Sequence, residues 1–266
     1  MTLAVAVMGV VNVTPDSFFP PSRTAATDDA IERGRRHFAD GADFVDVGGE
    51  STRPGATSVA AADELARVLP VVRALAGYGP VSLDTQKESV ARAGVAAGAT
   101  IINDVSASLF EVAGELGVGY VAMHRRGDAA TMQVRPRYGD VVAEVRDFLR
   151  GLAERARAAN VGELWLDPGI GFGKNVEHNL ALLANVGQFA ALAREYGAGL
   201  LVGTSRKRFL EHLGAGSLTV DDRLEGSLAS AAWAMMEGAA MVRVHDVRAT
   251  AQLRDLVARP YETVTT

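Results

Sequence analysis

Residues 81–105 read VSLDTQKESVARAGVAAGATIINDV, and this stretch contains the repeating unit of the fold. Two short β-rich runs, Val81–Thr85 and Ile101–Val105, each include polar residues near their ends. Between them, Gln86–Ala97 has the composition and spacing of a helix, and Gly98 follows it as a candidate left-handed cap. A strand, a helix and a second strand in this order are typical of a parallel sheet.

The same unit recurs along the whole chain. Further β-rich runs lie at Val5–Val13, Phe44–Gly49, Tyr120–His124, Leu164–Pro168, Leu200–Ser205 and Met241–Asp246. Helical spacing marks Asp28–Asp40, Ala61–Ala76, Val141–Ala159, Asn179–Tyr196, Glu225–Glu237 and a last stretch at Ala249–Ala258. The runs are nearly continuous in apolar residues, as in strands that are covered on both faces. Eight such units in 266 residues predict an α/β fold, a (β/α)8 barrel of the TIM type, as a single domain over residues 1–266.

Composition restricts the class of protein. Apolar residues make up 48% and charged residues 22%, as in globular domains. A net charge of -5 offers no basic field for wrapping nucleic acid. The chain has no cysteine, which excludes disulfides, thiolate metal ligands and a cysteine nucleophile, and which fits a reducing cytoplasm. We expect no membrane span, because no apolar run reaches about 18 residues.

Polar or charged residues follow the expected strands. They are Asn12, Glu50, Asp84, Asn103, His124, Asp167, Lys207, Arg243, His245 and Asp246. The carboxyl ends of all strands in a barrel meet on one face, where barrel enzymes keep their active sites. The pattern therefore predicts an enzyme whose site collects these side chains, although it does not identify the substrate.

Two chemical groupings stand out among these residues. Asp84, Asn103 and Asp167, with Lys207 nearby, suit the edge of a flat, guanine-like heterocycle, because carboxylates accept paired N–H bonds and lysine donates. Arg53, Arg243, His245 and Asn12 suit a diphosphate, since arginine grips phosphate oxygens and Asn12 offers a neutral oxygen to magnesium.

Alternatives stay open for these groupings. Asp84 and Asp167 could cap the helices that follow them. Arg243 could form an internal salt bridge, and His245 could be purely structural. Lys207 could form a Schiff base in an aldolase, where its two flanking arginines would suit an activated amine. Residues expected to be ordinary are the histidines His37, His178 and His212, which should face solvent, and the rim salt-bridge partners Lys174 and Arg206.

The chain resembles the dihydropteroate synthase family from residue 7 to residue 257. Its signature stretches read MGVVNVTPDSF at residues 8–18 and VDVGGESTRPG at residues 45–55. Further matches are Leu83-Asp84-Thr85, Ile102-Asn103-Asp104-Val105, Met123-His124, DPGIGFGK at residues 167–174, Ser205-Arg206-Lys207 and Arg243-Val244-His245-Asp246. So many motifs, in this order and each after its own strand, are highly specific.

The resemblance implies an enzyme of folate biosynthesis. Such an enzyme condenses 6-hydroxymethyl-7,8-dihydropterin diphosphate with 4-aminobenzoate to give 7,8-dihydropteroate and pyrophosphate. In this family the diphosphate leaves first, and the amine then attacks the methylene of the pterin cation, so electrostatic stabilisation matters more than a strong base. The resemblance also implies Mg2+ as cofactor. The acidic, cysteine-free composition and the apolar runs predict a cytoplasmic enzyme with neither nucleic acid nor membrane as partner. A homodimer through the last helices, which include the apolar stretch Leu224–Met236, is also expected.

The resemblance further implies a role for each matched residue. The pterin would be held by Asp84, Asn103, Met123, Asp167 and Lys207. The 4-aminobenzoate site would be lined by Phe18, Thr52, Arg53, Pro54, Phe172 and Arg208. The diphosphate would be held by Asn12, Thr52, Arg243 and His245, with Asn12 also on the magnesium ion. Catalysis would depend on Lys207, Asp84, Arg243 and His245.

One loop departs from the family pattern. The usual Ser-Phe-Ser-Asp-Gly-Gly reads here Ser17-Phe18-Phe19-Pro20-Pro21-Ser22. The prolines stiffen a loop that is expected to close over the second substrate. A catalytically silent homologue is therefore one alternative, although the other matched residues oppose it. A pterin-binding methyltransferase domain that serves a corrinoid protein is another, and the Gly-Glu-Ser-Thr-Arg-Pro motif argues against it.

Overall fold

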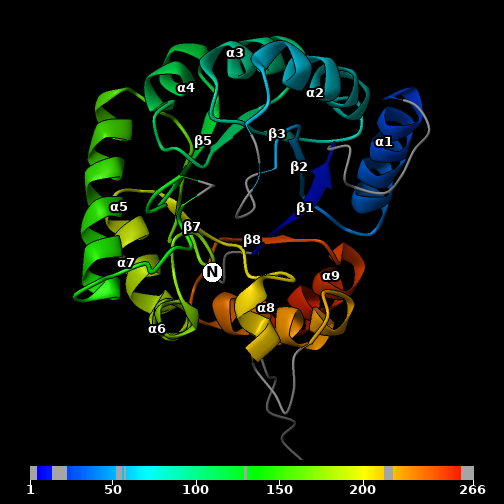
Figure 1. The fold of residues 1–266 in the computed structure, drawn as a ribbon. Coiled ribbons are helices and arrows are strands. Elements are labelled where there is room, and N and C mark those ends of the chain that lie inside the picture. Colours follow the sequence, from blue (N-terminus) through cyan, green and yellow to red (C-terminus); the bar gives the residue numbers. More distant parts are fainter. Residues whose placement is uncertain are drawn as a thin grey trace, which may run out of the picture.

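The computed structural model describes residues 5–13, 23–51, 56, 58–128, 131–212 and 218–258. Eight parallel strands close into a barrel in sequence order, and β1 pairs with β8. The strands are β1 (Ala6–Asn12), β2 (Phe44–Gly48), β3 (Val81–Asp84), β4 (Ile101–Asp104), β5 (Gly119–Met123), β6 (Leu164–Asp167), β7 (Gly199–Val202) and β8 (Met241–Val244). Helices surround them (Figure 1), which confirms the predicted α/β fold of the (β/α)8 barrel type.

The helices follow the strands in the alternating order that the sequence predicts. They are α1 (Arg23–Ala39), α2 (Ala61–Leu75), α3 (Glu88–Ala96), α4 (Phe110–Leu116), α5 (Val141–Ala158), α6 (Val176–Ala184), α7 (Val186–Glu195), α8 (Leu224–Met236) and α9 (Val247–Val257), with short 3-10 helices η1 (Arg208–His212) and η2 (Asp221–Arg223). None of the helices in the described part of the chain is long and apolar enough to cross a membrane.

One predicted helix is wrong in its extent. The single helix expected over residues 179–196 is two helices, α6 and α7, which meet at Asn185. The Asn185 backbone leaves the helical region, and its side-chain amide donates to Ala181 O at 2.8 Å. Its side-chain oxygen accepts from Gln188 Nε2 at 2.7 Å. Asparagine competes in this way for hydrogen bonds with helical backbone, and here it ends one helix and begins the next.

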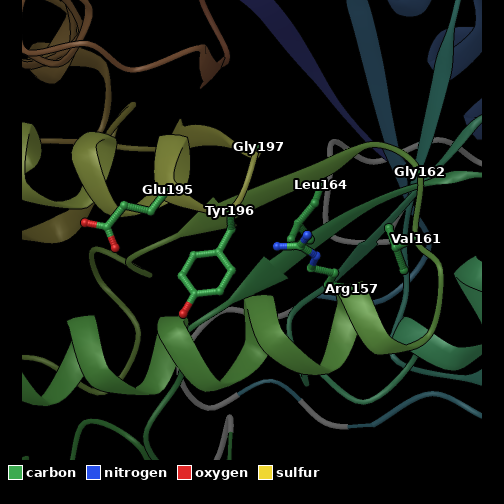
Figure 2. Close-up of a pocket in the computed structure, with 7 residues that line it drawn as sticks. All are labelled: Arg157, Val161, Gly162, Leu164, Glu195, Tyr196 and Gly197. Atoms are coloured by element: carbon green, nitrogen blue, oxygen red, sulfur yellow. The ribbon is translucent and has the colours of Figure 1, made fainter.

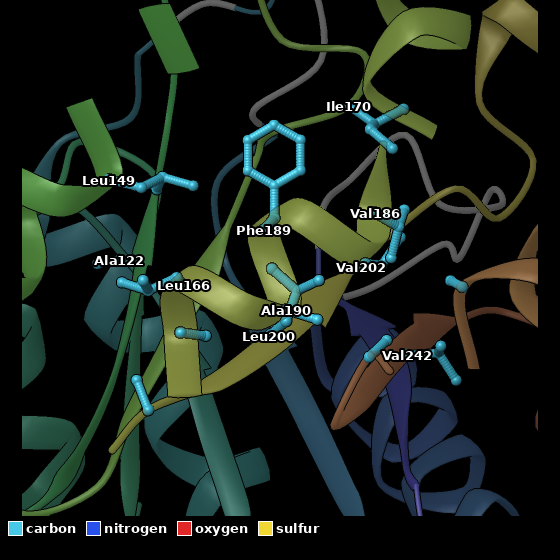
Figure 3. Close-up of a cluster of buried hydrophobic side chains, with 14 of the residues drawn as sticks. Ala122, Leu149, Leu166, Ile170, Val186, Phe189, Ala190, Leu200, Val202 and Val242 are labelled. Carbon is cyan, nitrogen blue, oxygen red and sulfur yellow. The ribbon is translucent and has the colours of Figure 1, made fainter. Parts of the chain in front are cut away.

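The main apolar core lies between the barrel and its outer helices. Figure 3 shows Phe189 and Val186 of α7 with Leu166 of β6 and Leu200 of β7, all fully or almost fully buried. Leu149 of α5 belongs to the same cluster. These strand residues alternate with side chains that point into the barrel, because successive side chains on a strand face opposite ways.

The inside of the barrel has an apolar floor near its amino-terminal end. The buried residues that form it are Met8, Ile101, Val121, Leu201 and Met241, with Ala6, Phe44 and Trp165 packed against them. Two glycines make room for the Trp165 indole, because a Cβ at Gly119 or Gly199 would approach it to 2.9 or 2.6 Å. The floor leaves the next layer of inward side chains, nearer the carboxyl ends, for polar groups.

Candidate active site

Four strands contribute to one hydrogen-bonded cluster above the apolar floor. Strand register places Asp84 on β3 beside Asn103 on β4. From β8, Arg243 Nη2 donates to Asp84 Oδ2 at 3.0 Å, and Arg243 Nε donates to Asp46 Oδ2 on β2 at 2.7 Å. Asn103 Nδ2 donates to the same Asp46 oxygen at 3.0 Å. The cluster therefore ties together strands from opposite parts of the chain.

A second pair of ionisable groups lies at the ends of β6 and β7. Asp167 Oδ1 accepts a hydrogen bond from Gly169 N at 2.7 Å. Lys207 Nζ donates to Ile170 O at 2.5 Å and lies 4.7 Å from the centroid of the Phe172 ring. Gly203 lies between Lys207 and Arg243, because a Cβ built there would be 3.7 Å from both Lys207 Nζ and Arg243 Cβ.

Burial shifts the pKa of three of these groups toward the neutral form of each side chain. It raises the pKa of Asp84 to about 7; the negative charge of Asp46 adds to this effect, and Arg243 opposes it. Burial also raises the pKa of Asp167, against the opposing charge of Lys207. The pKa of Lys207 falls to about 8, again through burial, with Asp167 opposing. Shifted groups gathered in one place are typical of functional sites.

A buried lysine supports the loop that follows β6. Lys174 is 2% exposed, and its Nζ contacts Gly169 O at 2.9 Å, Phe172 O at 3.0 Å and His124 Nδ1 at 2.8 Å. Gly169 has a φ of +65°, and a Cβ there would collide with His124 O at 1.8 Å. Lys174 is therefore a support for this loop, and the prediction that it forms a rim salt bridge is wrong.

A surface depression of about 390 Å³ lies away from this cluster. Figure 2 shows its lining, which includes Leu164 at the start of β6, Arg157 near the end of α5 and Tyr196 after α7. These positions belong to the amino-terminal end of the barrel, opposite the strand ends that carry Asp84 and Asp167. Its size therefore does not make it the candidate site, because the inward ionisable groups lie at the other end.

The chain matches known proteins over nearly its whole length. A family profile described as "Pterin binding enzyme" covers residues 8–245. The dihydropteroate synthase of Escherichia coli (strain K12) is 44% identical in an alignment 261 residues long, which covers 94% of this chain and 90% of that protein. The chain belongs to the dihydropteroate synthase family.

Two solved structures of dihydropteroate synthases share this fold. Xanthomonas albilineans dihydropteroate synthase with 4-aminobenzoic acid has a TM-score of 0.87 at 41% identity, covering 96% of this chain and 94% of that one. The same organism's enzyme in complex with 7,8-dihydropteroate has a TM-score of 0.84 at 38% identity, covering 98% and 96%. Identities of this size with matching folds support a residue-by-residue transfer of expectations from the dihydropteroate synthases.

Further residues expected from the dihydropteroate synthases, among those that the structure describes, lie at the same end of the barrel. Asn12 ends β1 and pairs in register with Gly48. Met123 ends β5 beside Asp167 and is buried. His245 follows β8, and its ring Nδ1 lies 3.1 Å from Ser205 Oγ. Arg208 differs from these, because its side chain is 82% exposed and pairs with Glu211 across 3.7 Å.

Several predicted site residues lie outside the described residues. They are Phe18, Thr52, Arg53 and Pro54, together with the proline-containing segment at residues 19–22. The two alternatives for Asp84 and Arg243 have clear outcomes. Asp84 does not cap α3, whose N-cap position is Lys87. Arg243 does form salt bridges inside the barrel mouth, with Asp46 and Asp84.

The rim of the site contains other ion pairs. Arg206 pairs with Asp246 at 2.7 Å and with Asp221 at 3.3 Å, which confirms its predicted salt-bridge role. Lys87 bridges the carboxylates of Glu50 and Glu64, and Glu50 also accepts from Val59 N at 3.2 Å. Glu50 therefore connects the segment that follows β2 to the segment that follows β3.

Two buried residues, Asp46 and His37, were not predicted correctly from the sequence. Asp46 was not singled out, although a charged residue between the apolar Val45 and Val47 was the available signal, since a buried charge needs a partner. His37 was expected to face solvent, and this is wrong. It is 8% exposed, and its Nε2 lies 3.1 Å from Val10 O. The His37 side chain therefore connects α1 to β1 by a hydrogen bond.

Proposed function

We infer that this chain catalyses the dihydropteroate synthase reaction, the condensation of 6-hydroxymethyl-7,8-dihydropterin diphosphate with 4-aminobenzoate. The products are 7,8-dihydropteroate and pyrophosphate. The observation that carries this conclusion is the inward cluster of Asp84, Asn103 and Arg243 beside Asp167 and Lys207. It lies in a chain that is 44% identical to the Escherichia coli synthase over almost the whole length of both.

The pterin edge is the group that this cluster suits. Asp84 and Asp167 accept N–H groups in their ionised forms, and the Asn103 amide offers both a donor and an acceptor. Lys207 donates to a ring nitrogen or carbonyl oxygen, and Met123 packs on the flat face. A site built from buried polar groups also rejects ligands that lack the matching groups, since unpaired groups are costly.

The charge balance of the cluster suits a cationic intermediate. Three carboxylates, Asp46, Asp84 and Asp167, face two cations, Arg243 and Lys207. When all are ionised, three negative charges against two positive charges leave an excess of one negative charge. As the C–O bond to the diphosphate breaks, positive charge spreads over the pterin and its methylene, and this excess stabilises it. The amine nitrogen then bonds to the methylene and releases a proton.

The departing diphosphate belongs at the outer side of this cluster. Arg243 and His245 lie two residues apart at the end of β8 and supply donors, and Asn12 ends β1. No group of three or more His, Asp or Glu side chains in the described ranges could hold a metal by itself. The side-chain oxygen of Asn12 would hold a magnesium ion bound together with the diphosphate, since such an ion needs few protein ligands and would keep most of its waters. Such an ion would neutralise charge on the leaving group.

The second substrate, 4-aminobenzoate, belongs between the loops at the barrel mouth. Phe172 supplies an aromatic face close to Lys207. Phe18, Thr52, Arg53 and Pro54 are proposed to complete the site, and Arg208, whose exposed side chain pairs with Glu211, is proposed to lie at its rim. Catalysis on this scheme depends on Lys207, Asp84, Arg243 and His245 as electrostatic and hydrogen-bonding groups.

A cytoplasmic homodimer is the proposed state of the enzyme. The absence of cysteine supports the location. Trp233 and Met236 of α8 are 45% and 71% exposed, and they lie three residues apart on one helix face, which supports a contact between subunits there. A mass measured by light scattering should be that of two chains, and Met236→Asp should reduce it. A single-chain mass for the unmodified protein would contradict the dimer.

One assay tests the function directly and separates it from methyl transfer. The purified chain is incubated with the pterin diphosphate, 4-aminobenzoate and Mg2+, and pyrophosphate is measured. Release of pyrophosphate that requires both substrates is expected. A chain that released none, but passed a methyl group from a pterin donor to an added corrinoid protein, would be a pterin-binding methyltransferase instead.

A further inference from the structure

Asp46 occupies the centre of the inward cluster, one layer deeper than Asp84. It is fully buried on β2, where register pairs it with Ser82, whereas Gly48, two residues further on, pairs with Asp84. Its Oδ2 atom accepts from two residues at once, Arg243 Nε at 2.7 Å and Asn103 Nδ2 at 3.0 Å. One carboxylate oxygen thus joins β2 to both β4 and β8.

These two hydrogen bonds fix the orientation of two groups that are proposed to meet the substrate. An Asn amide could otherwise rotate and exchange its donor and acceptor ends. Because Asn103 Nδ2 points to Asp46, its carbonyl oxygen must take the other direction. The Arg243 guanidinium is planar, so binding Asp46 through Nε and Asp84 through Nη2 fixes its plane as well as its position.

Asp46 also sets the electrostatic environment of Asp84. The charged groups that act on Asp84 are Asp46, Arg243, Glu64 and Asp104. Among these charges, Asp46 has the largest effect in raising the pKa of Asp84, and Arg243 acts in the opposite direction. A purely structural counter-ion for Arg243 would be redundant with Asp84, which already accepts from Nη2. The second carboxylate therefore needs a purpose beyond neutralising the arginine.

We propose that Asp46 is a positioning residue of the pterin site, which holds the Asn103 amide and the Arg243 guanidinium in the orientations that bind the pterin diphosphate. The proposal rests on the proposed function. Asp46 itself lies beneath these groups and acts through them. Its other oxygen, Oδ1, is buried and has no hydrogen-bond partner among the described residues. The carboxylate is therefore not part of a fully satisfied hydrogen-bond network, as a purely structural buried charge usually is.

The test is the substitution Asp46→Asn, which keeps the size of the side chain and removes its charge. The affinity for a pterin analogue, measured by calorimetry, should fall by about 10- to 100-fold, as for the loss of hydrogen bonds to a charged group. The KM for 4-aminobenzoate at saturating pterin diphosphate should stay within about two-fold, because the substitution weakens the binding of the pterin substrate alone.

The pH profile gives a readout that a merely structural role would not move. Asp84 is proposed to act as an ionised acceptor, and loss of the neighbouring negative charge lowers its pKa. The acid limb of kcat/KM for the pterin diphosphate should therefore shift to lower pH in Asp46→Asn. An unshifted limb together with unchanged pterin affinity would overturn the proposal.

Controls keep the outcome interpretable. Ser82→Ala is matched for position, since Ser82 pairs with Asp46, faces the same side and has a buried Oγ without a partner among the described residues. It should keep pterin affinity within about two-fold, because it removes no hydrogen bond. If unmodified protein forms no 7,8-dihydropteroate, the proposed function fails, whatever Asp46→Asn does.

A second variant covers the case in which Asp46→Asn does not fold. Asp46→Glu retains the charge opposite Arg243 but moves the carboxylate by one methylene. It should lose pterin affinity to a similar extent, without the downward shift of the acid limb. Normal pterin affinity in any folded variant, or failure of both variants to fold, would assign Asp46 to stability alone and contradict the proposal.

Discussion

Arg243 on β8 donates to the carboxylate of Asp84 on β3 at 3.0 Å, across the interior of the barrel mouth. The pair joins a group proposed to bind the diphosphate to a group proposed to bind the pterin. It also keeps a buried carboxylate near a charge of opposite sign, without which its ionised form would be much less favourable. Substitutions at this pair should therefore be among the most informative in the protein.

Asp84→Ala should abolish measurable pterin binding. The substitution leaves pterin donors without an acceptor, at a cost of about 1–3 kcal/mol or more, and leaves Arg243 with only Asp46. Calorimetry with a pterin analogue measures the effect. Asp43→Ala, directly before β2 at the other end of the barrel, is the matched control and should bind normally. Near-normal affinity in Asp84→Ala, or in Asp167→Ala, would show that these carboxylates do not hold the pterin.

The pH dependence of the reaction should reflect the ionisation of Asp84. Its pKa is raised to about 7, so it is protonated below that pH and then cannot accept two N–H bonds. The kcat/KM for the pterin diphosphate should therefore fall as pH decreases through about 7, a profile that reports the free enzyme. If kcat/KM for the pterin diphosphate did not change as the pH passed through about 7, Asp84 would not be the titrating acceptor.

Lys174→Met should loosen the loop after β6. The substitution removes hydrogen bonds to Gly169 O and Phe172 O, and unsatisfied buried carbonyls cost about 1–3 kcal/mol. Lower stability to urea is expected, together with a several-fold higher KM for 4-aminobenzoate, because Phe172 loses its support. Arg92→Met, which removes an exposed cation, is the control. If stability falls and the KM does not change, the loop does not position Phe172 for this substrate.

The sequence predicted the barrel because each unit repeats the same order of elements. The polar residues at the strand ends were also predictable. Asp84 and Asn103 end neighbouring parallel strands, so they lie side by side however the helices pack. The break at Asn185 was not, because one asparagine competes locally with an otherwise continuous helical pattern. The links from Asp46 to Arg243 and Asn103 depend on how the barrel closes, which no spacing along the chain encodes.

The altered first loop should weaken the binding of the second substrate. Pro20 and Pro21 cannot donate backbone hydrogen bonds, and Pro20 replaces an Asp that the family usually has. Restoring the family sequence by Phe19→Ser, Pro20→Asp, Pro21→Gly and Ser22→Gly should lower the KM for 4-aminobenzoate and raise turnover, with pterin affinity unchanged. Steady-state kinetics on both proteins decide the matter, and identical constants would make the loop a neutral variant.

The most direct test of the account is mass spectrometry of the joined product. The purified chain is given the pterin diphosphate, Mg2+ and 4-aminobenzoate labelled with 15N in its amine. The account predicts 7,8-dihydropteroate that carries the label, with one pyrophosphate for each product molecule, and no product from Asp84→Ala. Absence of labelled 7,8-dihydropteroate from the unmodified protein, with both substrates shown to be intact, would contradict it.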